Sequence, residues 1–246
     1  MSAADRIREL GLDDADVEAW RESRLSDDDL DDWLTDRIAR RPSGDRARAI
    51  YGADDVHDFA RRAILGALAL QPGDRLLDVG CGGGLLLRDA SARGAAATGL
   101  DHSPDMVALA RERAPGATVV EGSAEALPFA DGAYTAVSMS VVFFFVDDPI
   151  RVLTEARRVL APGGRLAVYT SAPELRGTPA APEPIASLGH FYTDDELADL
   201  ARRAGFGDVR VQRDPGDTGT RDGLAAGGQL LTARNVSRRA RISGEP

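Results

Sequence analysis

Leu76-Leu77-Asp78-Val79-Gly80-Cys81-Gly82-Gly83-Gly84 is the stretch that decides the fold of this 246-residue chain. An apolar run leads into a turn dense in glycine, and helix-forming residues follow directly. Glycine has no Cβ and tolerates positive φ, so backbone in such a turn can come close to a bound molecule. A second apolar run ends at Asp101, about where a strand–turn–helix–strand unit places a ribose-binding carboxylate. The two runs predict a site for a nucleoside cofactor.

The spacing of the glycines argues against a dinucleotide. The dinucleotide fingerprint G-x-G-x-x-G seats a pyrophosphate on a helix N-terminus. In either register of that motif, Leu85 or Leu87 stands where the third glycine is needed. Asp78 is a poor neighbour for a pyrophosphate and a suitable one for a cation. The pattern therefore favours a ligand with an ammonium or sulfonium group, and S-adenosylmethionine has both, together with a ribose diol and an adenine.

Four segments in order give the chain a family resemblance. Residues 72–170 resemble the core of the class I S-adenosylmethionine-dependent methyltransferases, particularly the branch that acts on small molecules and quinones. The resemblance implies an enzyme that methylates a small molecule at an oxygen, carbon or nitrogen atom. If the phenylalanines at 143–145 line the substrate pocket, they favour a hydrophobic or aromatic acceptor. The matching segments are D-x-G-x-G-x-G at 78–84, G-x-D-x-S-x-x-M at 99–106, G-x-A-E-x-L-P-F at 122–129 (G-D-A-E in the family) and R-V-L-x-P-G-G at 158–164.

The core alternates between expected strands and helices, which predicts a parallel sheet with right-handed crossovers. Expected strands lie at 75–79, 96–100, 118–120, 136–140 and 165–170, and expected helices at 85–93, 104–114 and 148–160. A capping box at 193–196 predicts another helix. Residues 208–213 and 229–233, joined by a long connection, predict a closing antiparallel pair. We therefore expect an α/β fold: a Rossmann-like, seven-stranded, mostly parallel sheet with helices on both faces.

Three domains are expected along the chain. Residues 1–53 are expected to form an N-terminal helical cap, because a capping pattern at 26–29 precedes apolar residues at helical spacing. Residues 40–44 resemble a linker into a helix at about 54–70. The methyltransferase domain is expected over 54–234, and residues 235–246 are expected to be a disordered tail.

Composition narrows the classes of partner. The net charge is −10, and residues 1–60 hold 17 acids and nine arginines. A nucleic-acid methylase needs a basic track, and the sequence offers none except the short arginine-rich tail at 234–241, so no nucleic-acid partner is expected. The acids at 27–32 suit a helix N-terminus better than a metal site, so no metal is expected.

Location and assembly follow from other features of the sequence. No apolar run is long enough for a membrane span, and no signal peptide is expected at the N-terminus. A single cysteine indicates a cytoplasmic protein. The sequence is compatible with a homodimer.

The cofactor contacts follow from chemistry and from the resemblance. Asp78 can accept from the methionine ammonium, and Asp101 can accept both ribose hydroxyls. The backbone of Gly80–Gly84 is expected to wrap the methionine and ribose. The full expected cofactor-binding set is Asp78, Gly80, Cys81, Gly82, Gly84, Asp101, His102, Met106, Ser123, Ala124, Glu125 and Ser140. His102 and Met106 are expected beside the adenine, where ordinary packing is the competing interpretation.

Two departures from the family pattern bear on the chemistry. The acid that usually binds the adenine amino group is replaced by Ser123, a neutral and weaker partner. Phe143-Phe144-Phe145 stands where small-molecule members often have a histidine pair, which removes an obvious general base. The three phenylalanines are either core or an aromatic wall of the substrate pocket.

Catalytic bases have to come from elsewhere in the chain. The chain has three histidines, His57, His102 and His190. Because the region before the capping box borders the substrate in the family, His190 and Tyr192 are the candidates, with Tyr51 behind them. Two alternatives stay open: an enzyme on this scaffold that catalyses cyclisation or elimination without transferring methyl, and a non-catalytic partner subunit.

Overall fold

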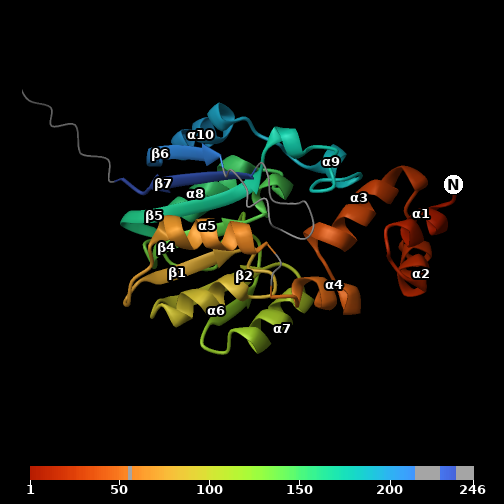
Figure 1. Cartoon of the computed structure of the whole chain (residues 1–246), viewed down its shortest axis with the longest axis horizontal. Coiled ribbons are helices and arrows are strands. Elements are labelled where there is room, and N and C mark those ends of the chain that lie inside the picture. Colours follow the sequence, from red (N-terminus) through yellow and green to blue (C-terminus); the bar gives the residue numbers. More distant parts are fainter. Residues whose placement is uncertain (55–56, 214–227, 237–246) are drawn as a thin grey trace, which may run out of the picture.

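The computed structural model describes residues 1–54, 57–213 and 228–236. A seven-stranded sheet lies at its centre, with helices on both faces (Figure 1). The strands are β1 (Arg75–Val79), β2 (Ala96–Asp101), β3 (Thr118–Glu121), β4 (Tyr134–Ser140), β5 (Leu160–Ser171), β6 (Gly207–Arg213) and β7 (Gly228–Arg234). The helices are α1 (Ala3–Glu9), α2 (Asp14–Ser23), α3 (Leu30–Thr35), α4 (Gly44–Tyr51), α5 (Asp58–Leu68), α6 (Leu85–Ala92), α7 (Pro104–Arg113), α8 (Pro149–Val159), α9 (Ile185–Leu188) and α10 (Asp194–Arg203).

The strand order is β3-β2-β1-β4-β5-β7-β6. Strands β1 to β5 pair in parallel, and β7 runs antiparallel to both β5 and β6. The expected Rossmann-like, mostly parallel fold is therefore confirmed. The chain reverses its direction of winding between β1 and β4, and ligands of open α/β sheets bind at the carboxyl ends of strands at such a point. The long connection expected before β7 lies outside the described residues over 214–227.

Helices α5, α6 and α7 cover one face of the sheet, and α8 and α10 cover the other. On the first face, Ile64 and Leu68 of α5 pack with Leu87 of α6 against β1. On the second, Leu153 of α8 and Leu197 of α10 are fully buried against β4 and β5. Both faces of the central strands are therefore apolar, as a parallel sheet requires.

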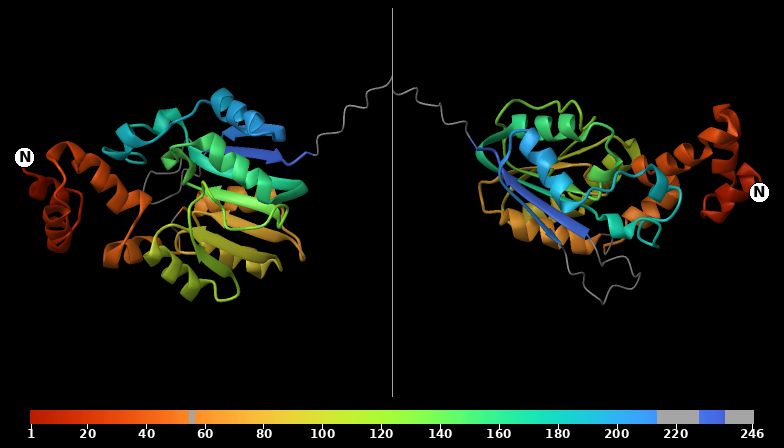
Figure 2. Two further views of the ribbon diagram at one scale, coloured as in Figure 1. Left: turned by 180° about the vertical axis from the view of Figure 1, so that it is seen from behind. Right: turned by 90° about the horizontal axis from the view of Figure 1, so that it is seen from above.

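The N-terminal helices form a small core of their own. Helices α1 to α3 project away from the sheet (Figures 1 and 2). The residues buried among them are Ile7, Leu12, Val17, Trp20, Leu30 and Leu34. Trp20 and Trp33 stack edge to face, with ring centroids 5.4 Å apart. This part of the expected cap is therefore stabilised internally rather than by the sheet.

Helix α4 was not expected from the sequence. It begins at Gly44, where the expected linker at 40–44 ends, so the linker does not lead directly into the helix expected at 54–70. The backbone N–H of Gly44 donates to the Asp105 carboxylate of α7 at 2.8 Å, and Arg48 pairs with Glu112 of the same helix. These tertiary contacts stabilise a short helix whose sequence shows no strong start signal. The helix expected at 54–70 begins at Asp58 instead.

The end of the described chain also differs from expectation. Asn235, assigned to a disordered tail, is buried, and its side-chain amide donates to the backbone oxygen of Leu160 at 2.6 Å. Residues 237–246 of the expected tail lie outside the described residues.

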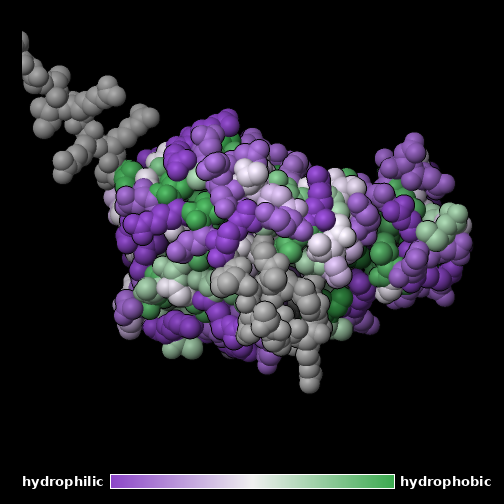
Figure 3. All heavy atoms as spheres, turned by 45° about the horizontal axis from the view of Figure 1, so that its top comes forward, coloured by the Kyte–Doolittle hydropathy of each residue, from purple (hydrophilic) through white to green (hydrophobic). Residues whose placement is uncertain are grey.

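Hydrophilic residues dominate the face shown in Figure 3, and hydrophobic residues appear on it in separate patches. None of the helices in the described part is long and apolar enough to cross a membrane.

Candidate cofactor and substrate site

A cavity of about 600 Å³ lies at the carboxyl ends of β1, β2 and β4, at the point where the sheet winding reverses. Three walls of this cavity come from the core: the glycine turn after β1, the segment after β2 and the segment after β4. Another wall comes from residues 36–42, between α3 and α4. Sheet and N-terminal segment therefore enclose the cavity together.

Asp78, at the end of β1, presents a buried acid to this cavity. It is 1% exposed, and the hydroxyl of Ser138 on β4 donates to its Oδ1 at 2.7 Å. Burial raises the pKa of Asp78 to about 7, the Ser138 hydrogen bond opposes that rise, and the nearby Asp101 adds to it. A cation bound here would stabilise the ionised carboxylate and recover part of the cost of burying it.

Backbone hydrogen bonds fix the glycine turn. The N–H groups of Gly80 and Cys81 both donate to the backbone oxygen of Leu100, at 2.7 and 3.0 Å. The N–H of Gly82 donates to Oδ2 of Asp101 at 2.8 Å. The turn is thus held against the end of β2, and the helix that follows it begins at Leu85.

The glycines of the turn serve different purposes. A Cβ on Gly80 would lie 2.4 Å from a Val142 methyl group, and one on Gly84 would lie 2.9 Å from the Ala110 Cα. Those two glycines allow close packing within the protein. A Cβ on Gly82 would meet no protein atom within 4 Å, although Gly82 has a φ of +49° and lines the cavity. The open side of Gly82 is a space that a ligand can fill, which fits a cofactor bound against the turn.

Asp101 holds the second acid of the site. It is 8% exposed, and its Oδ1 accepts the N–H of Ser103 at 2.9 Å while Oδ2 accepts the N–H of Gly82. Burial raises its pKa, and these two backbone hydrogen bonds oppose that rise. Two neighbouring buried acids in the wall of one cavity make a site that favours a ligand with a positive charge and hydroxyl donors.

The structure brings the whole expected cofactor-binding set to this cavity, since each of its twelve residues lines the wall. Met106 is 1% exposed, whereas His102 and Ser123 are exposed residues at the rim. A ring nitrogen of His102 contacts the backbone oxygen of Arg40, so this histidine joins the core to the N-terminal segment. No cluster of acids, cysteines or histidines suited to a metal ion occurs among the residues that the structure describes.

The three phenylalanines after β4 were expected to be either part of the core or a wall of the substrate pocket, and the structure shows both. Phe143 is fully buried in the sheet core, where its ring lies 5.8 Å from that of Tyr192. Phe144 and Phe145 line the cavity, with ring centroids 4.0 Å apart. The core therefore takes one ring and the cavity wall takes two.

The expected catalytic residues are only partly assembled here. Tyr51, at the end of α4, lines the cavity, and burial raises its pKa to about 12. His190 and Tyr192 are absent from the cavity wall, so the structure does not bring these two candidate bases to the site. The N–H of His190 donates to the Phe144 oxygen at 2.7 Å, which directs this segment along the outside of the aromatic wall, and the His190 side chain is exposed.

Sequence reasoning passed over several residues of the cavity wall, and two of them lie close together near the start of α5. His57 and Arg61, at the start of α5, both line the cavity. Their only sequence signal was that His57 is one of three histidines, since residues near 57 carry none of the family segments. Their place in the site depends on how α5 packs against α6.

Known proteins resemble this chain both in the sequence of residues 77–168 and in the fold. Residues 77–168 match the family model described as a methyltransferase domain. The demethylmenaquinone methyltransferase of Beutenbergia cavernae is 39% identical over 142 residues, 58% of this chain and 57% of that protein. Its namesake from Thermus thermophilus is 40% identical over 134 residues, covering 52% of this chain and 59% of that one. The chain thus spans little more than half the length of these curated relatives.

Solved structures extend the likeness beyond the matched segment. A structure from Thermotoga maritima, described as an S-adenosylmethionine-dependent methyltransferase and possible histamine N-methyltransferase, superposes with a TM-score of 0.60. It is 26% identical and covers 77% of this chain and 93% of its own. Residues 77–168 therefore match a methyltransferase domain, and the chain around them has the fold of S-adenosylmethionine-dependent methyltransferases, as the sequence predicted.

Proposed function

We propose that this protein transfers a methyl group from S-adenosylmethionine to a small hydrophobic or aromatic molecule. One observation carries the proposal. A single cavity has two buried acids and an open glycine turn on one side, and the rings of Phe144 and Phe145 on another. Such a cavity can hold a cationic nucleoside and an apolar acceptor together, which alignment of the two reactants requires.

The residues on the acidic side would hold the cofactor. Asp78 would accept from the methionine ammonium, Asp101 from the ribose hydroxyls, and the open side of Gly82 would face the ligand. Ser123 at the rim would accept from the adenine. Bound there, S-adenosylmethionine supplies an activated methyl group, so the protein contributes alignment and exclusion of water.

The residues on the apolar side suggest the acceptor. Phe144, Phe145, Val142 and Ile185 present rings and branched carbons to the cavity. Flat apolar molecules pack well against aromatic faces. The curated relatives are named for demethylmenaquinone, so a demethylmenaquinone in its reduced, dihydroxylated form and simple naphthols are the first acceptors to test.

The wider setting belongs to the same proposal. The N-terminal helices over residues 1–53 would act as a cap, because residues 36–42 wall the cavity. The acidic balance disfavours nucleic acid, and a single cysteine suits a reducing cytoplasm. A homodimer is compatible with this assignment.

Calorimetric titration with S-adenosylmethionine and S-adenosylhomocysteine tests the proposal, with Asp101→Ala as the comparison. We expect micromolar binding of both ligands, weakened strongly by the substitution. S-adenosylhomocysteine should then form when an acceptor is added. Binding without its formation from any acceptor would favour a non-methylating reaction on this scaffold, and absence of binding would contradict the enzyme assignment.

A further inference from the structure

The site as proposed lacks a group to take up the proton that methylation releases. When a hydroxylated aromatic is methylated at oxygen or carbon, one proton leaves the acceptor. Asp78 and Asp101 lie on the cofactor side, and the rings of Phe144 and Phe145 cannot take up a proton. Elsewhere on the cavity wall, the imidazole of His57 has the chemistry of a proton acceptor.

His57 reaches the cavity from the start of α5, as the residue that caps this helix. Its backbone is in the left-handed region, with a φ of 49°. Val141, which follows β4 and lines the same cavity, has a φ of 57° although it is β-branched. Such conformations persist where the surroundings impose them, and they gather at functional sites.

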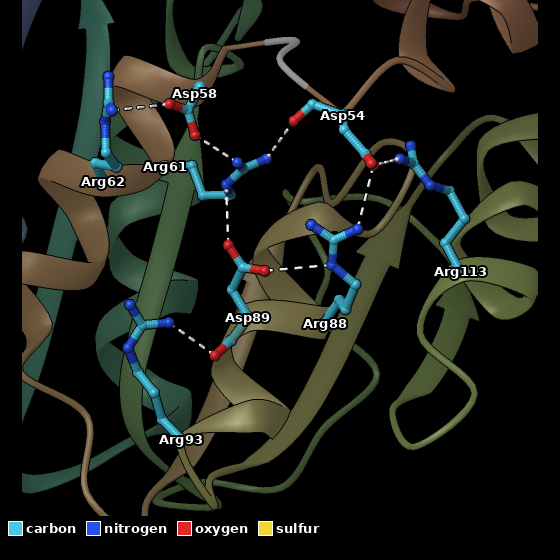
Figure 4. A network of polar contacts seen from close by, with 8 residues as sticks. All are labelled: Asp54, Asp58, Arg61, Arg62, Arg88, Asp89, Arg93 and Arg113. Carbon is cyan, nitrogen blue, oxygen red and sulfur yellow. Dashed lines mark hydrogen bonds and ion pairs between the residues drawn. The ribbon is translucent and has the colours of Figure 1, made fainter.

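A network of ion pairs holds the backbone on both sides of His57 (Figure 4). Arg88 and Arg113 pair with the Asp54 carboxylate, at 3.1 Å for Arg88. Arg61 pairs with Asp58, contacts Asp89 at 3.0 Å and donates to the backbone oxygen of Asp54 at 3.2 Å. The network ties the start of α5 to α6 and α7, which fixes the position from which the histidine projects.

The imidazole of His57 is partly buried beside two aromatic rings. Tyr51 and Phe59 lie edge-on to it, with centroids 6.3 and 6.2 Å away. Neither ring nitrogen has a hydrogen-bond partner among the residues that the structure describes. Burial lowers the pKa of His57 to about 4, so the ring is neutral near pH 7 and one nitrogen carries a free lone pair.

We infer that His57 is the proton acceptor of this site and that the acceptor substrate is a neutral hydroxylated aromatic. This inference rests on the proposed function. In the step, the acceptor oxygen or ring carbon bonds to the methyl carbon, the carbon–sulfur bond gives its electron pair to sulfur, and the acceptor proton passes to a His57 nitrogen. A proton on an acceptor that is being alkylated becomes strongly acidic, so a weakly basic imidazole suffices.

Other polar residues of the wall suit this role less well. Tyr51 is held protonated by its raised pKa, so it can donate but not accept a proton as a phenolate. Arg61 is always charged, and His102 contacts the backbone oxygen of Arg40 at the rim. Two carboxylates outside the expected cofactor-binding set also line the cavity, but Asp36 pairs with Arg40 at 3.1 Å and Asp147 is exposed to solvent. His57 alone combines a free nitrogen, neutrality and a place on the cavity wall among the described residues.

His57→Asn is the sharpest variant, because asparagine tolerates a left-handed backbone but cannot act as a base. The matched control is His190→Asn, at an exposed position outside the cavity. We expect methyl transfer to 1-naphthol to fall by about 10²- to 10⁴-fold in His57→Asn, the usual contribution of a general base. The dissociation constant for S-adenosylmethionine and the melting temperature should stay close to native values, and His190→Asn should match the native protein.

Comparing a neutral acceptor with an ionised one shows whether His57 acts as a base or has only a structural role, because an ionised acceptor needs no base. With 2,4-dinitro-1-naphthol, which is already ionised at neutral pH, the rate difference between native protein and His57→Asn should nearly vanish. An equal loss with both acceptors, or no loss with 1-naphthol, would overturn the inference while leaving the proposed function intact. Failure of the native protein to methylate any acceptor would instead contradict the proposed function.

A binding measurement tests the same contact without methyl transfer. The three histidines of the chain can be labelled with ¹⁵N, and the His57 ring signals are identified by their absence in His57→Asn. Addition of 1-naphthol to the cofactor-free protein should shift the His57 ring nitrogens and leave those of His190 unchanged. An unshifted His57 signal at saturating 1-naphthol would overturn the inference.

Discussion

The carboxylate of Asp101 accepts the backbone N–H of Gly82 at 2.8 Å, which ties the end of β2 to the middle of the glycine turn. Its other oxygen accepts the N–H of Ser103, at the start of α7. One acid therefore shapes the turn, the strand end and the following helix, and it also faces the cavity. A test of its role in binding must separate these structural contacts from contacts with a ligand.

Asp101→Asn makes that separation, because the amide keeps the shape of the side chain and one acceptor oxygen. Hydrogen bonds to charged groups contribute about 1.5–3 kcal/mol, so we expect S-adenosylmethionine affinity to fall by about 10- to 100-fold. Calorimetric titration measures this change. Glu121→Gln is the control, since Glu121 ends the neighbouring strand in register with Asp101 and should bind as the native protein does. Equal affinities in all three proteins would exclude Asp101 from the binding site.

Asp78 should make both binding and stability depend on pH. Its pKa is about 7 in the folded free protein and 3.8 for an ordinary aspartate, so the folded state holds the proton more tightly. The resulting stabilisation is fully present below about pH 4 and is lost as the pH rises toward 7. A cationic ligand needs the ionised acid, so binding below pH 7 should release a proton.

We therefore expect the affinity for S-adenosylmethionine to weaken as the pH falls from 7 to 5.5, by up to about tenfold per pH unit. Titrations in buffers of different ionisation enthalpy count the protons released. Asp78→Asn should bind weakly and lose this pH dependence. A native affinity that stays constant over this range would contradict the assignment of Asp78.

Gly82→Ala and Gly84→Ala should fail in different ways. Both residues have positive φ, which costs an alanine about 1–2 kcal/mol. At Gly84 the new methyl group would also meet Ala110, so we expect an added overpacking cost of about 1–3 kcal/mol. At Gly82 it would enter the open cavity instead, and cofactor binding should suffer more than folding does.

Urea unfolding and cofactor titration of both glycine variants make this comparison. Gly84→Ala should show the larger loss of unfolding free energy. Gly82→Ala should show the larger loss of cofactor affinity for a given loss of unfolding free energy. The reverse ranking would show that the space beside Gly82 is not used by the ligand.

Phe143→Ala should mainly reduce stability, because Phe143 belongs to the core, whereas Phe145→Ala should mainly affect the acceptor, because Phe145 lines the cavity. Phe143 is fully buried, so its truncation should cost about 3–5 kcal/mol of unfolding free energy. Phe145 is half-buried at the cavity, and its loss should mainly raise the KM for 1-naphthol, by about tenfold given the worth of burying a ring. Thermal melts and steady-state kinetics distinguish these effects, and an unchanged KM in Phe145→Ala would remove this ring from the acceptor site.

Most of the sheet could be predicted from the sequence, because apolar runs and turn residues are local signals. The expected strand at 75–79 matches β1, and the capping box at Thr193 starts α10 as expected. Helix α4 could not be predicted in this way, since Asp105 and Glu112 of α7 stabilise it from about 60 residues further along the chain.

The sequence by itself determined the two acids, the glycine turn and the positions of the core strands along the chain, because each depends on residues close together in the chain. Only the tertiary structure decided which polar residues complete the cavity. His190 follows the aromatic wall along the chain but lies outside the cavity, whereas His57, more than 80 residues before that wall, lies inside it. Helix packing on the sheet and the ion pairs around Asp54 and Arg61 set that position, and neither leaves a local trace in the sequence.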